Sequence, residues 1–324
     1  MKRLSGAVME NKELPQPIRC SIGIMAHNEG ANIGQLLQAI VSQRTSAAAL
    51  VEIIVIASGC TDDTEAIVKS WSTRDNRVRL VVQPQREGKA SAVNCFLAEA
   101  RENILVVSSA DLLPAEDTVE QLVIPFADPE VAMTSCRPVP VNDPSCFMGF
   151  AAHLLWNLHH FINLVDFKAG ELIAFRKVFV RIPYSTAVDE AAIESVIRGQ
   201  GYTVQYAERA ITYNKGPETV GDFLRQRRRI YSGHLILRDT VGYRVATLSN
   251  MRMLRLALSH LDWRPRAFLW TWVVAALEVY GRFLGKRDYK QRRNHTVWEI
   301  AKSTKQLDAP YPSNERGREY AGAK

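Results

Sequence analysis

An aspartate that follows an apolar run is the first residue of this chain whose position suggests chemistry. Asp111 comes directly after Ile104–Val107, where the end of a strand would leave its carboxylate free for a divalent ion. Mg²⁺ and Mn²⁺ take few protein carboxylates and complete their shell with water and phosphate oxygens, so one aspartate can suffice. Asp111 could instead open the turn before Pro114. Arg86 and Lys89, expected on a neighbouring loop, favour the metal site.

Charged residues also stand at the starts of two predicted helices. Lys89 follows Gly88, so its ammonium and the helix N-terminus can both face an anion such as a diphosphate. A lone Gly-Lys pair equally fits a solvent-facing lysine. Asp189 and Glu190 begin a helix predicted to reach Arg198, where the macrodipole favours carboxylates in any protein. One of the two could also accept the proton of an attacking hydroxyl.

A cluster of basic residues lies on a helix predicted later in the chain. Gln226 and Arg229 are three residues apart and share one face, and Arg225, Arg227 and Arg228 extend the positive charge around it. The cluster predicts an anionic ligand. Nucleic acid is a rival ligand, but no nucleic-acid module or pattern of stacking aromatics accompanies the cluster, so we expect no nucleic-acid partner.

Histidines and cysteines form no recognisable metal motif. His153, His159 and His160 lie in an aromatic-rich segment without an HExxH arrangement, which favours packing or acceptor contact. The 5 cysteines are scattered and include no C-x-x-C pair, so neither a disulfide framework nor a zinc site is predicted. Reduced thiols, and the lack of an apolar signal segment in Met1–Pro17, favour a cytosolic protein.

The candidate residues are expected at one edge of a mostly parallel sheet. Short apolar runs alternate with amphipathic segments up to about residue 136, which predicts an α/β fold with helices on both faces. Ligands bind such sheets beyond the carboxyl ends of the strands, so the polar loops there should converge. The strands are predicted at 21–26, 52–57, 78–82, 104–108 and 131–135. Their loops carry Asn28 and Glu29, then Ser58 and Gly59, then Arg86, Gly88 and Lys89, then Ser109, Ala110 and Asp111.

The second half of the chain is less regular and is expected to face the acceptor. A chain of 324 residues with 47% hydrophobic composition can bury one large core, or one core and a smaller appendage. The predicted elements are a helix over 147–164, a strand over 172–175, a helix from 190, a strand over 203–206 and helices to about 285. The predicted divisions are a flexible N-terminus at 1–17, a catalytic domain at 18–245, an amphipathic helical region at 246–302 and a disordered tail at 303–324.

The net charge of +7 and the pI near 9.2 favour an anionic partner, which could be a nucleotide diphosphate, a phospholipid surface or nucleic acid. Met251–Leu261 and Ala267–Leu284 mix arginines with apolar residues and tryptophan, which suits an anionic lipid interface. Helices packed against the catalytic domain would show the same pattern. The apolar run Ala267–Leu277 is shorter than the roughly 20 residues of a spanning helix, so we expect peripheral attachment to the inner membrane face.

The segments at the expected strand ends follow an order that is typical of one enzyme family. They are Ala26-His27-Asn28-Glu29, Ser58–Thr64, Gly88-Lys89-Ala90 and Ser109-Ala110-Asp111. In this order the chain resembles the inverting family 2 glycosyltransferases of the GT-A fold, over about Ser21–His234. The resemblance implies donor contacts from Ala26, Asn28, Glu29, Ser58, Lys89, Ser109 and Ala110, and a Mg²⁺ or Mn²⁺ ion on Asp111.

The resemblance continues through the second half. Gly170-Glu171-Leu172 is similar to the segment at the junction of donor and acceptor, and Asp189-Glu190 to the family's acidic pair, whose second member is the base. Gln226-Arg227-Arg228-Arg229-Ile230 resembles the Q-x-x-R-W motif. Gln226 and Arg229 would therefore hold the pyrophosphate and line the acceptor channel, with Lys89 and Arg229 stabilising the leaving diphosphate.

The resemblance implies transfer of a hexose from a UDP- or GDP-linked sugar to a saccharide or lipid-linked acceptor, in cell-surface polysaccharide or glycolipid synthesis. The sequence departs from the family at three places: Ala57 and Ser58 replace an acidic pair, Ser109 replaces the first carboxylate of D-x-D, and Ile230 replaces a tryptophan. The last change favours a single transfer over polymerisation.

Other functions fit the sequence less well. A sugar-phosphate nucleotidylyltransferase would carry a glycine-rich, arginine-containing loop after the first strand, where this chain has His27-Asn28-Glu29. An NAD-dependent oxidoreductase would carry G-x-G-x-x-G there. A non-enzymatic protein that binds membranes or nucleic acid through the basic helices remains the alternative outside enzymes.

Overall fold

The computed structural model describes residues 16–248, 255, 256, 259–293, 295–297, 304 and 307. The flexible N-terminus predicted for 1–17 lies outside these residues except at its last two positions. Most of the amphipathic segment Met251–Leu261 and most of the tail predicted from 303 also lie outside them.

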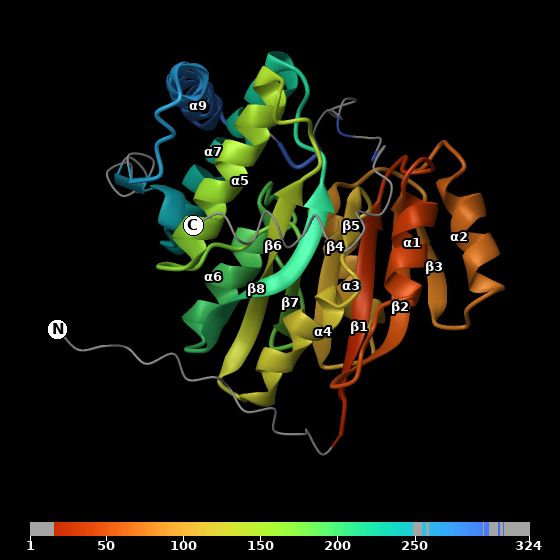
Figure 1. The fold of residues 1–324 in the computed structure, drawn as a ribbon. Coiled ribbons are helices and arrows are strands. Elements are labelled where there is room, and N and C mark those ends of the chain that lie inside the picture. The colour runs from red at the N-terminus through yellow and green to blue at the C-terminus, as the bar shows by residue number, and fades with distance from the viewer. Residues whose placement is uncertain are drawn as a thin grey trace.

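An eight-stranded sheet runs through the molecule in the order β3-β2-β1-β4-β7-β6-β8-β5 (Figure 1). Only β5 and β7 run against the others, so the predicted mostly parallel sheet is confirmed. The bounds are β1 Ile18–Ala26, β2 Ala48–Ser58, β3 Val78–Gln83, β4 Ile104–Ser109, β5 Leu112–Pro114, β6 Val131–Pro140, β7 Ile173–Arg176 and β8 Thr203–Asn214.

Alternate residues of the central strands pack against helices on opposite faces of the sheet. On β2, Ile53 and Val55 join the core beneath α1 (Ile33–Val41), α2 (Thr64–Ser72) and α4 (Thr118–Val123), which continues into the short 3-10 helix Ile124–Ala127. Ile54 and Ile56 join the core beneath α3 (Lys89–Glu99) and α6 (Asp189–Gly199). A strand that is buried on both faces has a continuous run of apolar residues, so these strands could be predicted from the sequence.

Gly23 of β1 permits the closest helix contact on the α3 face. A Cβ atom at this position would lie 2.4 Å from the Phe96 ring, and Phe96 is fully buried. Any side chain at position 23 would therefore push α3, and with it Lys89, away from the sheet.

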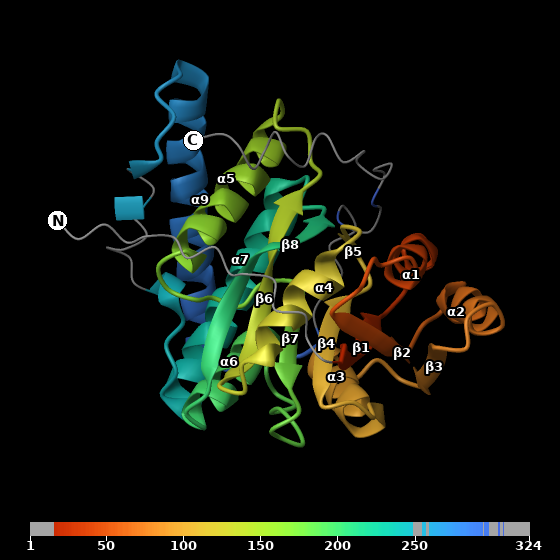
Figure 2. The same cartoon turned by 60° about the horizontal axis from the view of Figure 1, so that its bottom comes forward.

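Three helices form a layer beside the other end of the sheet. These are α5 (Phe147–Asn163), α7 (Val220–Val241) and α9 (Pro265–Lys290), and a short 3-10 helix, Ala246–Leu248, follows α7. Figures 1 and 2 show them grouped together, away from α1 and α2, with α9 at the outer edge. Thr219 caps α7 by accepting a hydrogen bond from the backbone N–H of Asp222 (3.1 Å). Gly242, in the left-handed conformation (φ 72°), ends the helix.

The helix α9 is longer than expected. It has 26 residues and is long and apolar enough to cross a membrane by length and composition, so the expectation that this segment is too short was wrong. Glu278 and Arg282 do not interrupt it, because they pair with each other one turn apart (2.9 Å). One face packs on α7 through residues that include Gly281 and Gly285. The opposite face exposes Leu269, Trp272, Val273, Val279, Tyr280 and Phe283.

Three further expectations need correction. The strand β5 has no counterpart among the predicted strands, and β6 and β8 are longer than the strands predicted at 131–135 and 203–206. Both long strands pair with each other as far as Pro140 and Asn214, and β5 adds to the edge of β8. Pairing with a neighbour, which no local pattern reveals, extends these strands.

Candidate active site

The ends of β1, β2 and β4 and the start of α3 meet at one side of a cleft of about 1340 Å³. The second half of the chain lines the opposite side. All predicted site residues except Asn28 line this cleft: Ala26, Glu29, Ser58, Lys89, Ser109, Ala110, Asp111, Gly170, Glu171, Asp189, Glu190, Gln226 and Arg229.

Asn28 connects two loops and does not face the cleft. Its backbone is left-handed (φ 53°), and its Oδ1 accepts a hydrogen bond from the N–H of Thr61 (2.8 Å). His27 Nδ1 lies 2.7 Å from the carbonyl oxygen of Ser58, which ties the same loops again. Asn28 therefore shapes the first two loops, because its short amide side chain tolerates this backbone and bonds to the neighbouring loop.

Asp111 stands where β4 passes into β5. The N–H of Ala110 donates to the carbonyl oxygen of Met25 (3.2 Å), and Leu112 pairs with Asn214 of β8. Both neighbours of Asp111 are buried, so the backbone is held on either side of its carboxylate. Ala110 and Asp111 form the turn that joins β4 to β5, and Pro114 belongs to β5. Asp111 therefore lies in a turn, as the alternative interpretation expected, and it also lines the cleft.

Lys89 links the two halves of the cleft. Its Nζ lies 2.5 Å from Glu190 Oε1 and 3.1 Å from Asp189 Oδ2, and its side chain is only 14% exposed. Burial alone would lower the pKa of Lys89, but Asp189 and Glu190 raise it above its ordinary value. The solvent-facing alternative is thereby excluded, and the lysine keeps its positive charge beside the carboxylates of α6.

The two carboxylates of α6 differ in their readiness to ionise. Burial would raise the pKa of Glu190, but attraction and a hydrogen bond from Lys89 hold it below its ordinary value. Burial, followed by repulsion from Glu190, raises the pKa of Asp189. Glu190 therefore ionises more readily than Asp189.

Two more carboxylates face the same space. Burial raises the pKa of Glu171 to about 7, and the negative charges of Asp111 and Glu190 add to the shift. Burial also raises the pKa of Asp111, although Lys89 and Arg229 oppose the shift. Four acidic groups thus share this end of the cleft with two cations, and a further positive charge would stabilise them.

A divalent ion fits this surplus of negative charge. Within the residues that the structure describes, no three His, Cys, Asp or Glu side chains are arranged to chelate a metal. The carboxylate of Asp111 at the strand end is the hard oxygen ligand that Mg²⁺ or Mn²⁺ prefers, and diphosphate oxygens would have to supply further ligands. The residues present therefore fit an ion that binds together with a phosphate-bearing substrate.

The junction residues Gly170 and Glu171 lie between the sheet and α5. The N–H of Gly170 donates to the Ser135 hydroxyl (2.8 Å), and a Cβ atom at position 170 would lie 3.2 Å from the His159 ring. Glycine at this position therefore lets the chain pass close to β6 and α5 and brings Glu171 to the cleft.

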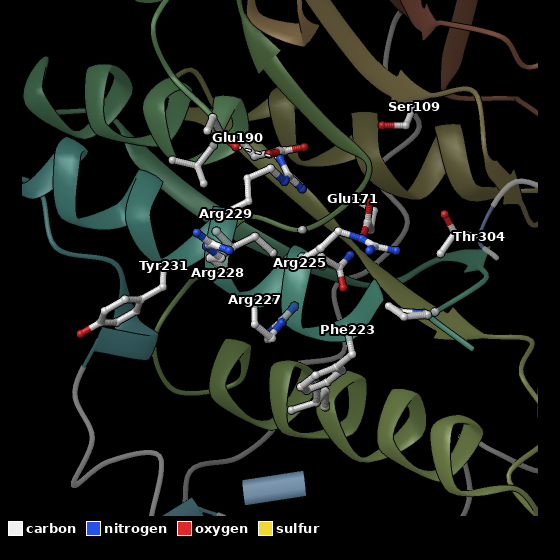
Figure 3. Close-up of a pocket in the computed structure, with 18 of the residues that line it drawn as sticks. Ser109, Glu171, Glu190, Phe223, Arg225, Arg227, Arg228, Arg229, Tyr231 and Thr304 are labelled. Atoms are coloured by element: carbon white, nitrogen blue, oxygen red, sulfur yellow. Dashed lines mark hydrogen bonds between the residues drawn. The ribbon is translucent and has the colours of Figure 1, made fainter. Parts of the chain in front are cut away.

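The arginines of the basic cluster on α7 contact different neighbours. Arg229 lies near the carboxylate of Glu190 (Figure 3) and donates to the carbonyl oxygen of Ala187 (2.9 Å), which braces the start of α6. Arg228 pairs with the buried Asp288 of α9, and Arg225 pairs with Asp222. All four arginines of the cluster line the cleft, although a helix presents successive residues to different neighbours. The anionic ligand expected for this cluster stays a prediction.

The predicted histidines have separate contacts. His153 Nε2 lies 2.9 Å from the carbonyl oxygen of Asn142, and His160 Nδ1 lies 2.8 Å from the Tyr206 hydroxyl. His159 is buried and lines the cleft. These contacts are typical of packing, with His159 alone close to where an acceptor would lie.

Several cleft residues were not predicted as site residues. Arg86 follows β3, as its position in the predicted loops implied, and could have been included on that signal. Lys168, Glu278 and Arg282 also line the cleft. No sequence signal connects these three, because helix packing alone brings them together.

Solved and curated proteins resemble this chain over most of its length. A mannosyltransferase from Pyrobaculum calidifontis, solved with GDP-mannose and Mn²⁺, matches with a TM-score of 0.62 at 20% identity, over 86% of this chain and 89% of that one. The likeness is one of fold, and it confirms the predicted GT-A architecture with a C-terminal helical extension.

The curated relatives are longer proteins. A probable glycosyltransferase of Bacillus subtilis, YdaM, is 28% identical over 244 residues, which cover 69% of this chain and 56% of the relative. A poly-β-1,6-N-acetyl-D-glucosamine synthase of Staphylococcus aureus is 25% identical over 203 residues, covering 58% of this chain and 49% of the relative. The chain thus spans about half the length of these relatives. The family model for glycosyl transferase family 2 matches residues 21–197, which is more than half of the chain, so this protein belongs to glycosyltransferase family 2, as its motifs predicted.

Proposed function

We propose that this chain transfers a hexose from a nucleoside-diphosphate sugar to an acceptor hydroxyl, with inversion at the anomeric carbon. The observation that carries the proposal is the meeting of carboxylates and cations from distant elements in one cleft. These residues are Asp111 after β4, Glu171 before β7, Asp189 and Glu190 on α6, Lys89 on α3 and Arg229 on α7.

The donor lies against the loops that follow the first strands of the sheet. Ala26, Glu29 and Ser58 line the cleft and would border the nucleotide, while Lys89, Gln226 and Arg229, which line the same cleft, would bind its diphosphate. The Pyrobaculum calidifontis mannosyltransferase of the same fold was solved with GDP-mannose and Mn²⁺, which supports a UDP- or GDP-linked donor and a divalent ion.

Glu190 acts as the general base. Because Lys89 keeps its carboxylate ionised, Glu190 can take the proton of the acceptor hydroxyl as that oxygen bonds to the anomeric carbon. The bond from this carbon to the diphosphate oxygen breaks on the opposite side, which inverts the centre. Arg229 and Lys89 stabilise the negative charge of the departing nucleoside diphosphate. Mg²⁺ or Mn²⁺ held by Asp111 would supply further positive charge there.

The acceptor is a saccharide or lipid-linked saccharide of the cell surface, and the enzyme adds a single sugar. Ile230 supports single transfer, because it packs beside Val188 and Leu237 and offers no aromatic plane for a growing chain. The S. aureus relative is a polysaccharide synthase, which supports a role in surface glycan synthesis.

The enzyme binds the cytosolic face of an anionic membrane through α9. An exposed apolar stripe runs along this helix at three- and four-residue spacing and includes Leu269, Trp272, Tyr280 and Phe283. Arg287 and Lys290 continue the same stripe at its C-terminal end, which complements anionic headgroups.

A donor screen tests the catalytic proposal. The purified chain would be incubated with UDP- and GDP-linked hexoses and Mn²⁺, and release of the nucleoside diphosphate would be measured with and without EDTA. We expect one nucleotide class to be turned over and EDTA to abolish the signal. Absence of binding and turnover for every nucleotide sugar would refute the proposal.

Vesicle sedimentation tests the membrane proposal. Replacing Phe283 by serine should reduce binding to vesicles that contain anionic lipid, because an inserted ring would be lost. Val180 is 85% exposed and lies away from α9, so Val180→Ser is the matched control and should bind as the wild type does. Equal binding by all three proteins would contradict the membrane proposal.

A further inference from the structure

The cleft continues beyond the catalytic carboxylates into a space between α5, α7 and α9. We call this space the basic chamber and define it by Lys168, Arg227, Arg282 and Glu278, all of which line the cleft. Figure 3 shows Arg227 and Phe223 on a different side of α7 from Arg229 and Glu190. The chamber is therefore a separate part of the cleft and is not used by the proposed donor or base.

The basic chamber holds more positive than negative charge. Glu278 accepts a hydrogen bond from Arg282 Nε (2.9 Å), and its other oxygen lies 3.9 Å from Arg227 Nη1. Within the described part of the chain, Arg227 Nε is buried without a hydrogen-bond partner, and the ammonium of Lys168 has no ion pair. Glu278, with Glu194 as a second carboxylate near Lys168, thus stands against three cations. Arg227 Nε and Glu278 Oε2 are both buried without a hydrogen-bond partner in the described part of the chain.

Electrostatics within the chamber agree with this count. Burial lowers the pKa of Lys168 to about 8, and repulsion from Arg227 adds to the shift, with Glu278 acting against it. His234, which also lines the cleft, has its pKa lowered by burial and by the same cations, so it adds no charge near neutral pH. A bound anion would relieve this repulsion and satisfy the buried donors.

An apolar path connects the basic chamber to the outer face of α9. Val279 and Phe283 line the cleft, yet they are 68% and 62% exposed, so the cleft opens at these residues onto the apolar stripe. Leu154 and Leu155 of α5 also line the cleft. An anionic group in the chamber could therefore carry an alkyl chain that leaves along this path.

We propose that the acceptor is a lipid whose phosphate group binds in the basic chamber, with its hydroxyl-bearing head directed to Glu190 and its alkyl chain leaving past Val279 and Phe283 to the membrane. The proposal rests on the proposed function and narrows its acceptor to phosphate-bearing lipids. A phosphate supplies the charge and the acceptor oxygens that Lys168 and Arg227 lack, and the chain matches the apolar path.

Calorimetry with decyl phosphate, below its micelle concentration, tests the site without any turnover. We expect one molecule to bind per chain, and decanol and inorganic phosphate to bind at least about tenfold more weakly, because each lacks one half of the ligand. Lys168→Met should weaken decyl phosphate binding about tenfold or more, since a charge-assisted hydrogen bond is lost. Arg238→Ala is the matched control, because Arg238 pairs with Asp239 outside the cleft.

The Lys168→Met variant is expected to fold, because the substitution removes no ion pair. Arg227→Lys, which keeps the positive charge beside Glu278, provides a second variant. In transfer assays both variants should raise the KM for a phospholipid-linked acceptor more than they lower kcat. Decyl phosphate that binds no tighter than decanol, or Lys168→Met that binds it as the wild type does, would overturn the proposal. If inorganic phosphate binds as tightly as decyl phosphate, the chamber binds a free anion, and the proposal of a lipid acceptor is overturned. The proposed function fails separately, if Glu190→Gln retains full transfer.

Discussion

The two ends of the cleft carry opposite charge. The acidic end brings Asp111, Glu171, Asp189 and Glu190 together with Lys89 and Arg229. The basic chamber brings Lys168, Arg227 and Arg282 together with Glu278. In both places like charges are buried near one another, and burial shifts pKa values toward the uncharged form, upward for Glu171 and downward for Lys168.

The difference indicates what each end binds. Buried charges without enough counter-charge are costly to the folded protein, and they are often kept where a ligand brings the missing charge. The acidic end is built on strand ends and the start of a helix, which hold carboxylates firmly enough for a small ion. The basic chamber is built from four long side chains, of which three come from helices, and these can enclose a larger group such as a phosphate.

Removing the base should have the largest effect on the acidic end. Glu190→Gln keeps the size of the side chain but cannot take a proton, so we expect kcat to fall about a thousandfold with little change in donor affinity. Steady-state kinetics and calorimetry with the nucleotide would measure the two quantities. Glu208→Gln, on the exposed part of β8, is the control. A folded Glu190→Gln variant with normal kcat would show that the acidic end does not act as a base.

Removing the metal ligand should have the next largest effect. Asp111→Asn retains the shape at the end of β4 but loses the charge, so we expect a loss of about a hundredfold in kcat/KM. The nucleoside diphosphate should also lose the Mn²⁺-dependent part of its affinity, which calorimetry with and without Mn²⁺ would detect. Unchanged Mn²⁺ dependence in this variant would assign the ion to other ligands.

Glu171→Gln should stabilise the folded protein, because it removes one buried carboxylate from the acidic end of the cleft. The pKa of Glu171 is raised to about 7 in the folded state, so its ionised form destabilises the fold fully above pH 7 and not below its unfolded pKa of about 4.5. We expect a Tm increase of about 2 °C at pH 8 that disappears near pH 4.5. A thermal scan that gives the same increase at both pH values would point to packing and not to charge.

Lys168→Met should show the opposite pH dependence with a smaller effect. The pKa of Lys168 is lowered to about 8 in the folded state, so its charged form destabilises the fold fully below pH 8 and not above its unfolded pKa of about 10.5. We expect a Tm increase of about 1 °C at pH 6 that fades toward pH 10. Thermal scans of Glu171→Gln and Lys168→Met over the same pH range would test whether the two ends of the cleft carry opposite charge. Tm changes with the same pH dependence in both variants would contradict that difference.

The nucleotide-binding half could be predicted from the sequence because its rules are local. Ile53–Ile56 is apolar throughout since the strand is buried on both faces, and polar residues follow each such strand at the sheet edge. Seven of the thirteen predicted site residues that line the cleft lie in this half for that reason: Ala26, Glu29, Ser58, Lys89, Ser109, Ala110 and Asp111. Asn28 was assigned to the donor, yet it bonds to Thr61, because the motif reveals a loop but not which way each side chain turns.

By itself, the sequence determined the succession of strands and helices in the nucleotide-binding half, the loops that carry chemistry and the family to which the protein belongs. Only the tertiary structure decided which charges meet. Lys89 and Glu190 are 101 residues apart, Arg228 and Asp288 are 60 apart, and Lys168 comes from a third region. Local periodicity reports which face of an element is buried, whereas these contacts depend on how helices and strands pack across the molecule, and that packing alone separates the acidic end of the cleft from the basic chamber.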